Sequence, residues 1–217
     1  MDKELRNLDI EYRLKDGESR EVTGYAIIFN SLSHDLGGFR EEIMPSALDG
    51  VIERSDCVAL LNHDPNRGIL GRSKFGKGSL KLTVDEIGMQ FNFDAPKTSL
   101  GDETLEYLRR GDANQCSFAF TVAEGGDRWT KQSDGTYLRQ ILQFDRIFDC
   151  SILTCTPAYE ATSVKCRSFE VFKEKEAEEL RAEQERQAAE EETQKEAKLA
   201  EYYKQLHEEY DKIIKGE

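Results

Sequence analysis

Apolar and polar residues alternate in short runs along the first part of the chain. Residues 79–84 (SLKLTV) and 89–93 (MQFNF) alternate on either side of residues 85–88, where Gly88 can take a positive φ angle. This arrangement predicts a β-hairpin, because successive side chains of a strand point to opposite faces. Residues 21–29 (EVTGYAIIF) and 58–62 (VALLN) are short apolar runs that also predict strands.

One segment in the middle of the chain has the period of a helix. It covers residues 99–110 (SLGDETLEYLRR), where Ser99 can cap the start and Gly111 can end the last turn. Strand patterns then return in three segments: residues 114–122 (NQCSFAFTV), 137–144 (YLRQILQF) and 147–154 (IFDCSILT).

Short strands with few helices and no repeated strand-helix alternation favour a closed or rolled, mainly antiparallel sheet. The predicted class is therefore α+β, with a barrel-like β core and a few helices. Beyond this core the composition changes sharply, and nearly every residue is Glu, Lys, Gln, Ala or Arg. We expect one domain at residues 1–167, followed by an acidic helical tail at residues 168–217.

The tail has no proline, and its only glycine is Gly216, so a long helix is permitted throughout. Its middle has little apolar surface and gains only charge pairs four residues apart, which is compatible with a solvated helix or with disorder. Near its end an a/d stripe lacks a core of its own, and another copy, a scaffold or the body of the domain can serve as its partner. The stripe consists of Leu199, Tyr203, Leu206, Tyr210 and Ile213.

Charge excludes some classes of function. The 217 residues carry a formal net charge of -13 and have a pI near 4.9, which argues against nucleic acid as a partner. No apolar run approaches the roughly 18 residues that a membrane span needs, and the N-terminus lacks the pattern of a signal peptide. We therefore expect a soluble, unsecreted protein without a membrane partner.

The cysteines and histidines do not suggest a metal or a disulfide framework. Five cysteines, an odd number, lie in apolar stretches, which indicates a reducing cytoplasm. No pair has the C-x-x-C spacing of a zinc site, and the chain has only three histidines. We expect no metal and no other cofactor.

Ser117 and Cys116 stand side by side in the strand NQCSFAFTV. Strand alternation directs Cys116 with the rings of Phe118 and Phe120 into the core and directs Ser117 to the opposite face. Ser117 is then either a small polar residue on a half-buried strand or a serine nucleophile, which needs a base to take its proton.

His63 is the candidate base. It ends the apolar run VALLN and opens the turn HDPN, where a side chain is held rigidly yet stays reachable. Unperturbed histidine has a pKa near neutrality, as a general base requires. The alternative is a histidine that caps a turn. The other two histidines, His34 and His207, lie in a glycine-containing loop and in the charged tail.

Asp149 is the candidate for the third group of a triad, which orients the imidazole. It lies in an apolar strand, where an unpaired carboxylate is costly to bury, so it requires a partner. The residue types leave histidine and an arginine, Arg139 or Arg146, equally open as that partner. Asp145 is a weaker candidate because it lies at an expected bend.

A series of motifs between residues 23 and 167 matches a known family in order and spacing. The motifs are GYAIIFN at 24–30, DLGGFREEIMPSAL at 35–48, LLNHD at 60–64, ILGR at 69–72, RRGD at 109–112, CSFAF at 116–120 and DCSILTCTPAYEAT at 149–162. With these motifs the chain resembles the tailed-phage prohead (capsid maturation) proteases, serine peptidases related in fold to the herpesvirus assemblin.

The resemblance implies that His63 is the catalytic histidine and Ser117 the nucleophile. The acidic family position falls on Asp149, where many relatives have Glu, so this third group is one methylene shorter here. The resemblance also implies an endopeptidase inside the procapsid, in the cytoplasm of a bacterial host. Its expected substrates are scaffold segments of the major capsid protein and the protease itself, in an oligomer.

Two other functions are compatible with these residues. One is a non-enzymatic assembly protein that keeps a protease-like fold as a scaffold. The other is a cysteine peptidase that uses Cys116, which the expected core position of that side chain disfavours.

Overall fold

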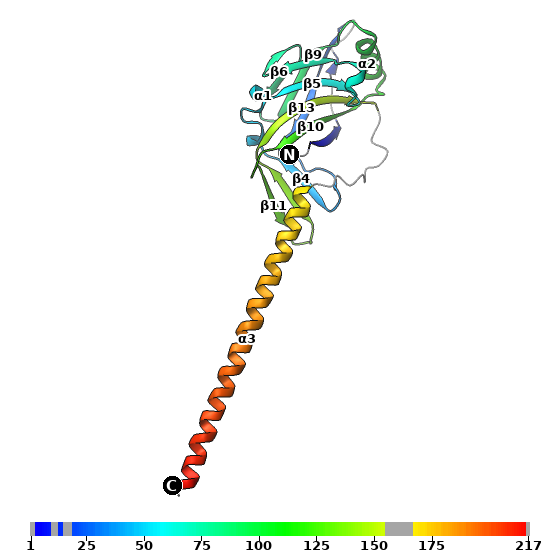
Figure 1. The fold of residues 1–217 in the computed structure, drawn as a ribbon. Helices are drawn as coiled ribbons and strands as arrows, with labels where there is room; N and C mark the ends of the chain where they lie inside the picture. The colour runs from blue at the N-terminus through cyan, green and yellow to red at the C-terminus, as the bar shows by residue number, and fades with distance from the viewer. Residues whose placement is uncertain (1–2, 10–12, 15–18, 155–166, 216–217) are drawn as a thin grey trace. The chain divides into compact units, whose positions relative to one another are not determined.

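The computed structural model describes residues 3–9, 13–14, 19–154 and 167–215. The chain divides into two compact units, Met1–Val164 and Lys165–Glu217, and each is considered by itself. Figure 1 shows the strands and helices of the first unit and the single helix α3 (Arg167–Lys215) of the second. Residues 155–162, the end of the motif at 149–162, lie outside the described residues.

The first unit is made of strands with a few short helices (Figure 1). Its strands are β1 (Glu4–Asp9), β2 (Arg13–Leu14), β3 (Glu21–Ile28), β4 (Phe39–Ile43), β5 (Asp56–Leu61), β6 (Gly71–Lys74), β7 (Lys77–Gly78), β8 (Lys81–Val84), β9 (Gly88–Asp94), β10 (Gln115–Val122), β11 (Asp127–Lys131), β12 (Tyr137–Ile141) and β13 (Phe144–Leu153). Its helices are η1 (Pro45–Leu48), α1 (Val51–Arg54), η2 (Pro65–Arg67) and α2 (Ser99–Arg110).

The strands form three sheets. The largest has six strands in the order β1-β10-β13-β5-β6-β7, and β10, β13 and β5 run side by side through its middle (Figure 1). The others have the orders β2-β3-β9-β8 and β11-β12-β4. Most pairs are antiparallel, and the exceptions among the described strands are β13 with β5 and β12 with β4.

One hydrophobic core connects the six-stranded and four-stranded sheets. The rings of Phe118 and Phe120 in β10 lie 5.3 Å apart, and Phe120 meets Phe144 edge-on at 4.7 Å. Phe91 and Phe93 of β9 join the same cluster of buried residues. Each pair belongs to the apolar half of an alternating strand, so the sequence pattern itself decides which faces pack together.

The predicted α+β class with mainly antiparallel strands is confirmed, but the described strands do not close into a barrel. The six-stranded sheet ends at β1 on one side and at β7 on the other. β10 takes the N-terminal strand β1 at its outer edge rather than a strand of the β3–β9 sheet. The three sheets are therefore joined by side-chain packing and by ion pairs rather than by continuous strand pairing.

The predicted hairpin and helix are both present. β8 pairs with β9 around a turn at residues 85–87, and Gly88 is already the first residue of β9. Helix α2 ends at Gly111, whose φ of 76° is the left-handed conformation that glycine accepts without strain. The predicted cap is one residue off, because the side chain of Thr98, not Ser99, accepts a hydrogen bond from the N–H of Gly101.

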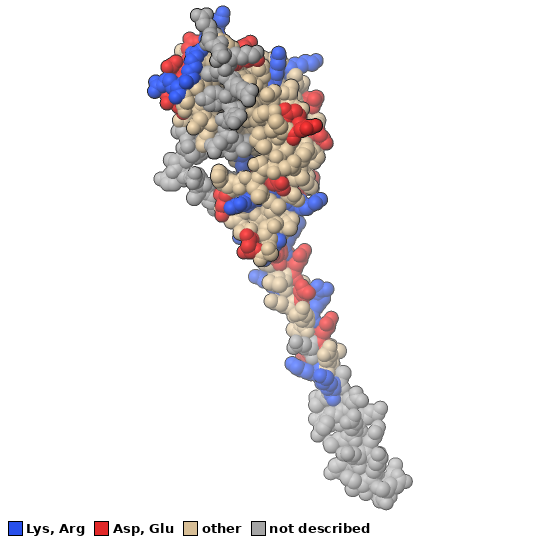
Figure 2. All heavy atoms as spheres, turned by 180° about the vertical axis from the view of Figure 1, so that it is seen from behind, with Lys and Arg blue, Asp and Glu red and all other residues tan. Residues whose placement is uncertain are grey.

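Helix α3 carries Lys, Arg and Glu side chains, and so charges of both signs, along its described length (Figure 2). Every described side chain from residue 177 to residue 198 is exposed. The side chains of the a/d stripe from Leu199 to Ile213 lie outside the described part. Among the helices that the structure describes, none is long and apolar enough to cross a membrane.

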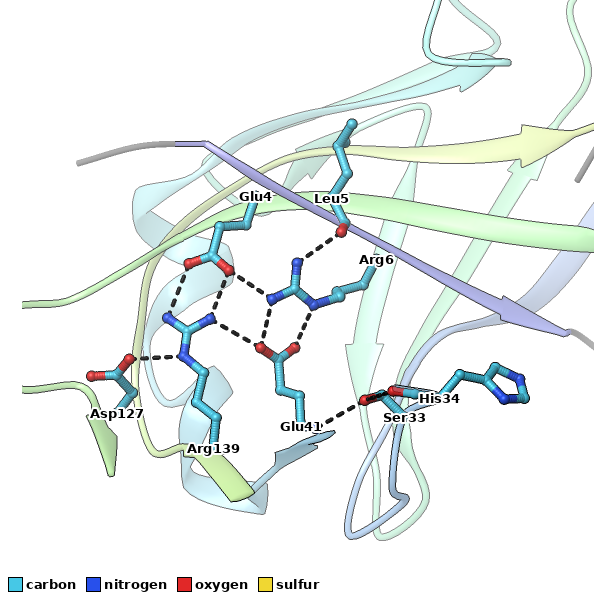
Figure 3. A network of polar contacts seen from close by, with 8 residues as sticks. All are labelled: Glu4, Leu5, Arg6, Ser33, His34, Glu41, Asp127 and Arg139. Carbon is cyan, nitrogen blue, oxygen red and sulfur yellow. Dashed lines mark hydrogen bonds and ion pairs between the residues drawn. The ribbon is translucent and has the colours of Figure 1, made fainter. Parts of the chain in front are cut away.

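A buried network of charges joins β1 to the three-stranded sheet (Figure 3). Arg6 in β1 donates two hydrogen bonds to Glu41 in β4, of 2.7 and 2.6 Å. Arg139 in β12 donates to Glu41 at 2.9 Å, to Glu4 at 2.6 and 2.9 Å and to Asp127 at 2.8 Å. Arg139 is only 1% exposed and Glu41 3%, so each charge depends on its partners.

Replacing Glu41 should destabilise the first unit strongly. In the Glu41→Leu variant two buried guanidinium groups lose the carboxylate that lies between them, and breaking such a buried pair costs about 3–5 kcal/mol. Urea denaturation followed by circular dichroism measures this loss. The control is Asp56→Leu, which removes the carboxylate of a largely exposed pair with Arg72. Equal losses in the two variants would contradict the role assigned to the network.

Candidate active site

Three polar side chains share one face of the six-stranded sheet. Ser117 in β10 lies opposite Ser151 in β13, and Asp149 precedes Ser151 by two residues. Side chains two residues apart in a strand lie on the same face, so all three point the same way. All are buried, with exposed fractions of 0% for both serines and 3% for Asp149.

The opposite face of these strands belongs to the core. Cys116, Phe118 and Cys150 are members of the hydrophobic cluster. The predicted directions of Cys116 and Ser117 are thus confirmed. Burial and the charge of Asp149 raise the pKa of the Cys116 thiol far above its ordinary value, so this sulfur stays protonated at neutral pH.

His63 is positioned by a turn that directly follows β5. Asn62 and His63 have φ angles of 55° and 56°, a left-handed conformation that is uncommon for residues other than glycine but enriched in Asn and His. The N–H of Asn62 donates to the carbonyl of Ile152 at 2.9 Å, which extends the pairing of β5 with β13. The side chain of Asn62 donates to Thr154 Oγ1 and accepts from its N–H, at 2.8 and 2.9 Å. This turn is therefore fastened to the end of β13.

The turn brings the imidazole of His63 to Asp149. The Nδ1 atom of His63 lies 2.6 Å from Oδ1 of Asp149. Ser151 Oγ donates to the same Oδ1 at 2.9 Å, and Lys3 Nζ donates to Oδ2 at 3.1 Å. Both oxygens of the buried carboxylate therefore have donors, as a buried charge requires.

These contacts set the charge of Asp149. Burial raises its pKa, but the hydrogen bond and charge of His63 lower it, as do the hydrogen bonds from Ser151 and Lys3, and the net pKa lies below its ordinary value. Asp149 is thus a carboxylate at neutral pH. Because a carboxylate can only accept, Nδ1 of His63 must carry the shared proton, and a neutral imidazole then has its lone pair on Nε2.

Two atoms of the site lack hydrogen bonds in the described structure. Nε2 of His63 and Oγ of Ser117 are both buried and have no partner among the described residues. The structure thus joins His63 to Asp149 and puts Ser117 on the same sheet face as Asp149, but no hydrogen bond links His63 to Ser117. Buried polar atoms rarely stay unpaired, and catalytic hydrogen bonds are often long without substrate.

The other candidates for the partner of Asp149 lie elsewhere. Arg139 is bound in the buried network with Glu41. Arg146 is 3.9 Å from Asp145, which also accepts a hydrogen bond from Thr121 at 3.4 Å. Of the two kinds of partner that the residue types left open, histidine and arginine, the structure therefore has a histidine, His63, at Asp149. His34 is exposed, and the side chain of His207 lies outside the described part.

Sequence reasoning missed Ser151 and Lys3. Ser151 could have been found, because its position two residues after Asp149 puts it on the same strand face. Lys3 gave no signal, since its contact with Asp149 spans 146 positions of the chain. Over the described ranges, no three His, Cys, Asp or Glu side chains gather closely enough to hold a metal ion.

Comparison with known proteins gives a family for the chain. The sequence profile described as caudovirus prohead serine protease matches residues 7–175. Among solved structures, the capsid assembly protease of bacteriophage T4 is similar at 7% sequence identity and a TM-score of 0.41, over 70% of this chain and 99% of that one. No curated protein matches the chain. Because the family profile covers more than half of the 217 residues, the chain belongs to the caudovirus prohead serine protease family.

Proposed function

We propose that this chain is a serine endopeptidase that cleaves scaffold segments of the major capsid protein, and itself, during procapsid maturation. Ser117 is the nucleophile, His63 the general base and Asp149 the group that orients the base. The observation that carries this proposal is the 2.6 Å contact of His63 Nδ1 with the buried carboxylate of Asp149, on the sheet face that also bears Ser117.

The proposed mechanism follows from the state of each group. Asp149 holds the Nδ1 proton, so Nε2 accepts the proton of Ser117 as Oγ attacks the scissile carbonyl. The imidazolium that forms is stabilised by the carboxylate and then protonates the leaving amine. Water hydrolyses the acyl-enzyme in a second cycle of the same proton transfers. Substrate binding must bring Nε2 of His63 and Oγ of Ser117 within about 3 Å of each other, the distance that proton transfer needs.

The proposed setting is the interior of the procapsid in a bacterial host. There the enzyme meets the major capsid protein, its scaffold segments and other copies of itself. Cys116 is a poor alternative nucleophile, since its thiol faces the core and stays protonated. The remaining alternative is an assembly protein without catalysis, and substitution of the triad separates it from an enzyme.

Substituting Ser117 should abolish cleavage. We expect Ser117→Ala and His63→Ala each to lose about a millionfold in kcat, as triads generally do when either member is removed. Mass spectrometry of self-cleavage fragments, with isotopically labelled Ser117→Ala chain as substrate, measures the rate. Cys116→Ala is the matched control and keeps its activity. If wild type and Ser117→Ala persist intact to the same extent, the non-catalytic alternative gains support.

Asp149→Asn should retain substrate binding but lose rate. An amide cannot stabilise the imidazolium and can hold His63 in the wrong tautomer, so kcat should fall by about 10⁴-fold with little change in KM. A comparable fall for Asp145→Asn would contradict the assignment of Asp149.

The same Asp149→Asn variant should show a specific dependence of stability on pH. The folded pKa of Asp149 lies below its ordinary value of 3.8. The ionised group therefore stabilises the fold above that value, and this contribution is lost as the pH falls through the folded pKa. The difference in free energy of unfolding between wild type and variant should be full at pH 7 and shrink under acid conditions. Urea titrations at several pH values measure it.

We further propose that residues 168–217 form a helical appendage that directs the protease into the procapsid and is trimmed by self-cleavage. Its support is the long helix α3, whose described side chains are exposed from residue 177 onward. A helix that buries so little surface within its own chain gains most from an external partner. The alternative is an acidic tail that only maintains solubility.

Deleting residues 168–217 separates these roles. A targeting appendage predicts that the truncated protease folds and cleaves in solution but enters procapsids at a much lower copy number. Quantitative mass spectrometry of purified procapsids measures that number. Full incorporation of the truncated chain would leave only the solubilising role.

A further inference from the structure

The strand that carries Ser117 has no open edge in the described structure. β10 pairs on one side with β13 and on the other with the N-terminal strand β1. The β1 ladder is antiparallel and runs from Glu4 opposite Phe120 to Asp9 opposite Gln115. Asn7 lies directly opposite Ser117 in this register. The backbone of β1 therefore runs about 5 Å from that of the nucleophile.

An endopeptidase must take its substrate in an extended form to expose one peptide bond to the nucleophile. An extended peptide binds well by adding a strand to a free sheet edge, where backbone hydrogen bonds hold it irrespective of sequence. At β10 this edge is already filled by a segment of the same chain. Ser117 has an exposed fraction of 0%, so the nucleophile is covered in this arrangement.

Contacts on both faces of β1 hold it in place. On the core side, Arg6 and Glu4 enter the buried charge network with Glu41 and Arg139 (Figure 3). On the other side, Lys3, directly before β1, donates to the Asp149 carboxylate. A cation beside Asp149 competes electrostatically with the imidazolium that catalysis must form on His63. The docked strand thus both covers the edge of β10 and opposes the chemistry.

We infer that the outer edge of β10 is the binding site of the extended peptide substrate and that β1 occupies it as a displaceable inhibitory strand. This inference rests on the proposed function. Substrate binding and release of β1 are then the same exchange. The charge network makes spontaneous release of β1 rare. The protease therefore stays slow until a high local concentration of substrate segments competes with β1 for the edge of β10.

A disulfide that fixes β1 to β10 tests the inference. Leu8 lies opposite Cys116 in the register. Directly opposed residues of antiparallel strands have Cα atoms about 4.5–5.5 Å apart, within the range that a disulfide accepts. The single substitution Leu8→Cys therefore allows a bond that oxidation forms and reduction breaks. Peptide mapping by mass spectrometry shows that the bond has formed.

The assay is cleavage of labelled Ser117→Ala chain by the full-length variant before and after reduction. We expect the oxidised form to be slower by about 30-fold or more, the effect of a typical disulfide on an opening equilibrium, and reduction to restore the rate. Leu8→Ser controls for oxidation of the native thiols and should not respond. Equal rates in the oxidised and reduced forms of Leu8→Cys would overturn the inference and leave the proposed function intact.

A second variant loosens β1 instead of fixing it. Arg6→Leu removes the paired hydrogen bonds to Glu41, while Arg139 still donates to that carboxylate. Cleavage should become severalfold faster than in wild type, whereas Arg110→Leu, which loses an exposed pair with Asp112, should leave it unchanged. A slower Arg6→Leu enzyme that is still folded would count against a displaceable strand. Absence of cleavage by both Arg6→Leu and reduced Leu8→Cys would overturn the proposed function, and the inference with it.

Discussion

The antiparallel pairing of β10 with β13 determines the position of nearly every group in the candidate site. The two strands present phenyl rings and thiols to the core, and they present Ser117, Ser151 and Asp149 to the other face. A register shift of one residue would exchange these sets, burying the carboxylate in the core and exposing the rings. The same hydrophobic energy that stabilises the core therefore holds the polar groups in their places. β5, on the other side of β13, adds His63 to this frame through the turn at its end.

The molecule satisfies its buried charges in two different ways. In the network around Arg139, guanidinium groups meet carboxylates, and an arginine does not lose its proton at any pH that a protein survives. At Asp149 the main partner is the imidazole of His63, whose two ring nitrogens can donate and accept a proton. The first arrangement suits a permanent joint between sheets, and the second suits proton transfer. The segment around β1 takes part in both, through Arg6 of β1 and through Lys3 directly before it.

The elements predicted from sequence were those that bury a regular apolar pattern. The strands around Ser117, the hairpin of β8 and β9 and the helix α2 each have a clear period, and each is present. β1 was not predicted, because its sequence ELRNLD has little apolar character and its Arg6 is paired with Glu41, far away in the chain. Of the two sheet forms predicted, closed or rolled, the described strands do not form the closed one, and strand patterns alone do not specify which strand takes the outer edge of β10.

The candidate site was predictable in its residue types but not in its contacts. A histidine at a strand end and an aspartate within an apolar strand are conspicuous in sequence, and both belong to the site in the structure. The pairing of this histidine with this aspartate could not be predicted, because from residue types alone an arginine or a histidine can satisfy a buried carboxylate equally well. The missing hydrogen bond between His63 and Ser117 has no counterpart in sequence at all, since it depends on ångström-scale placement of two side chains.

Helix α3 also has a geometric consequence. With 49 residues and a rise of about 1.5 Å per residue, it is about 74 Å long. A partner that binds the last turns of this helix is thereby held at a fixed distance, the length of the helix, from its first residue. For the role proposed for residues 168–217, such a tether would raise the effective concentration of the protease near neighbouring chains without any added affinity.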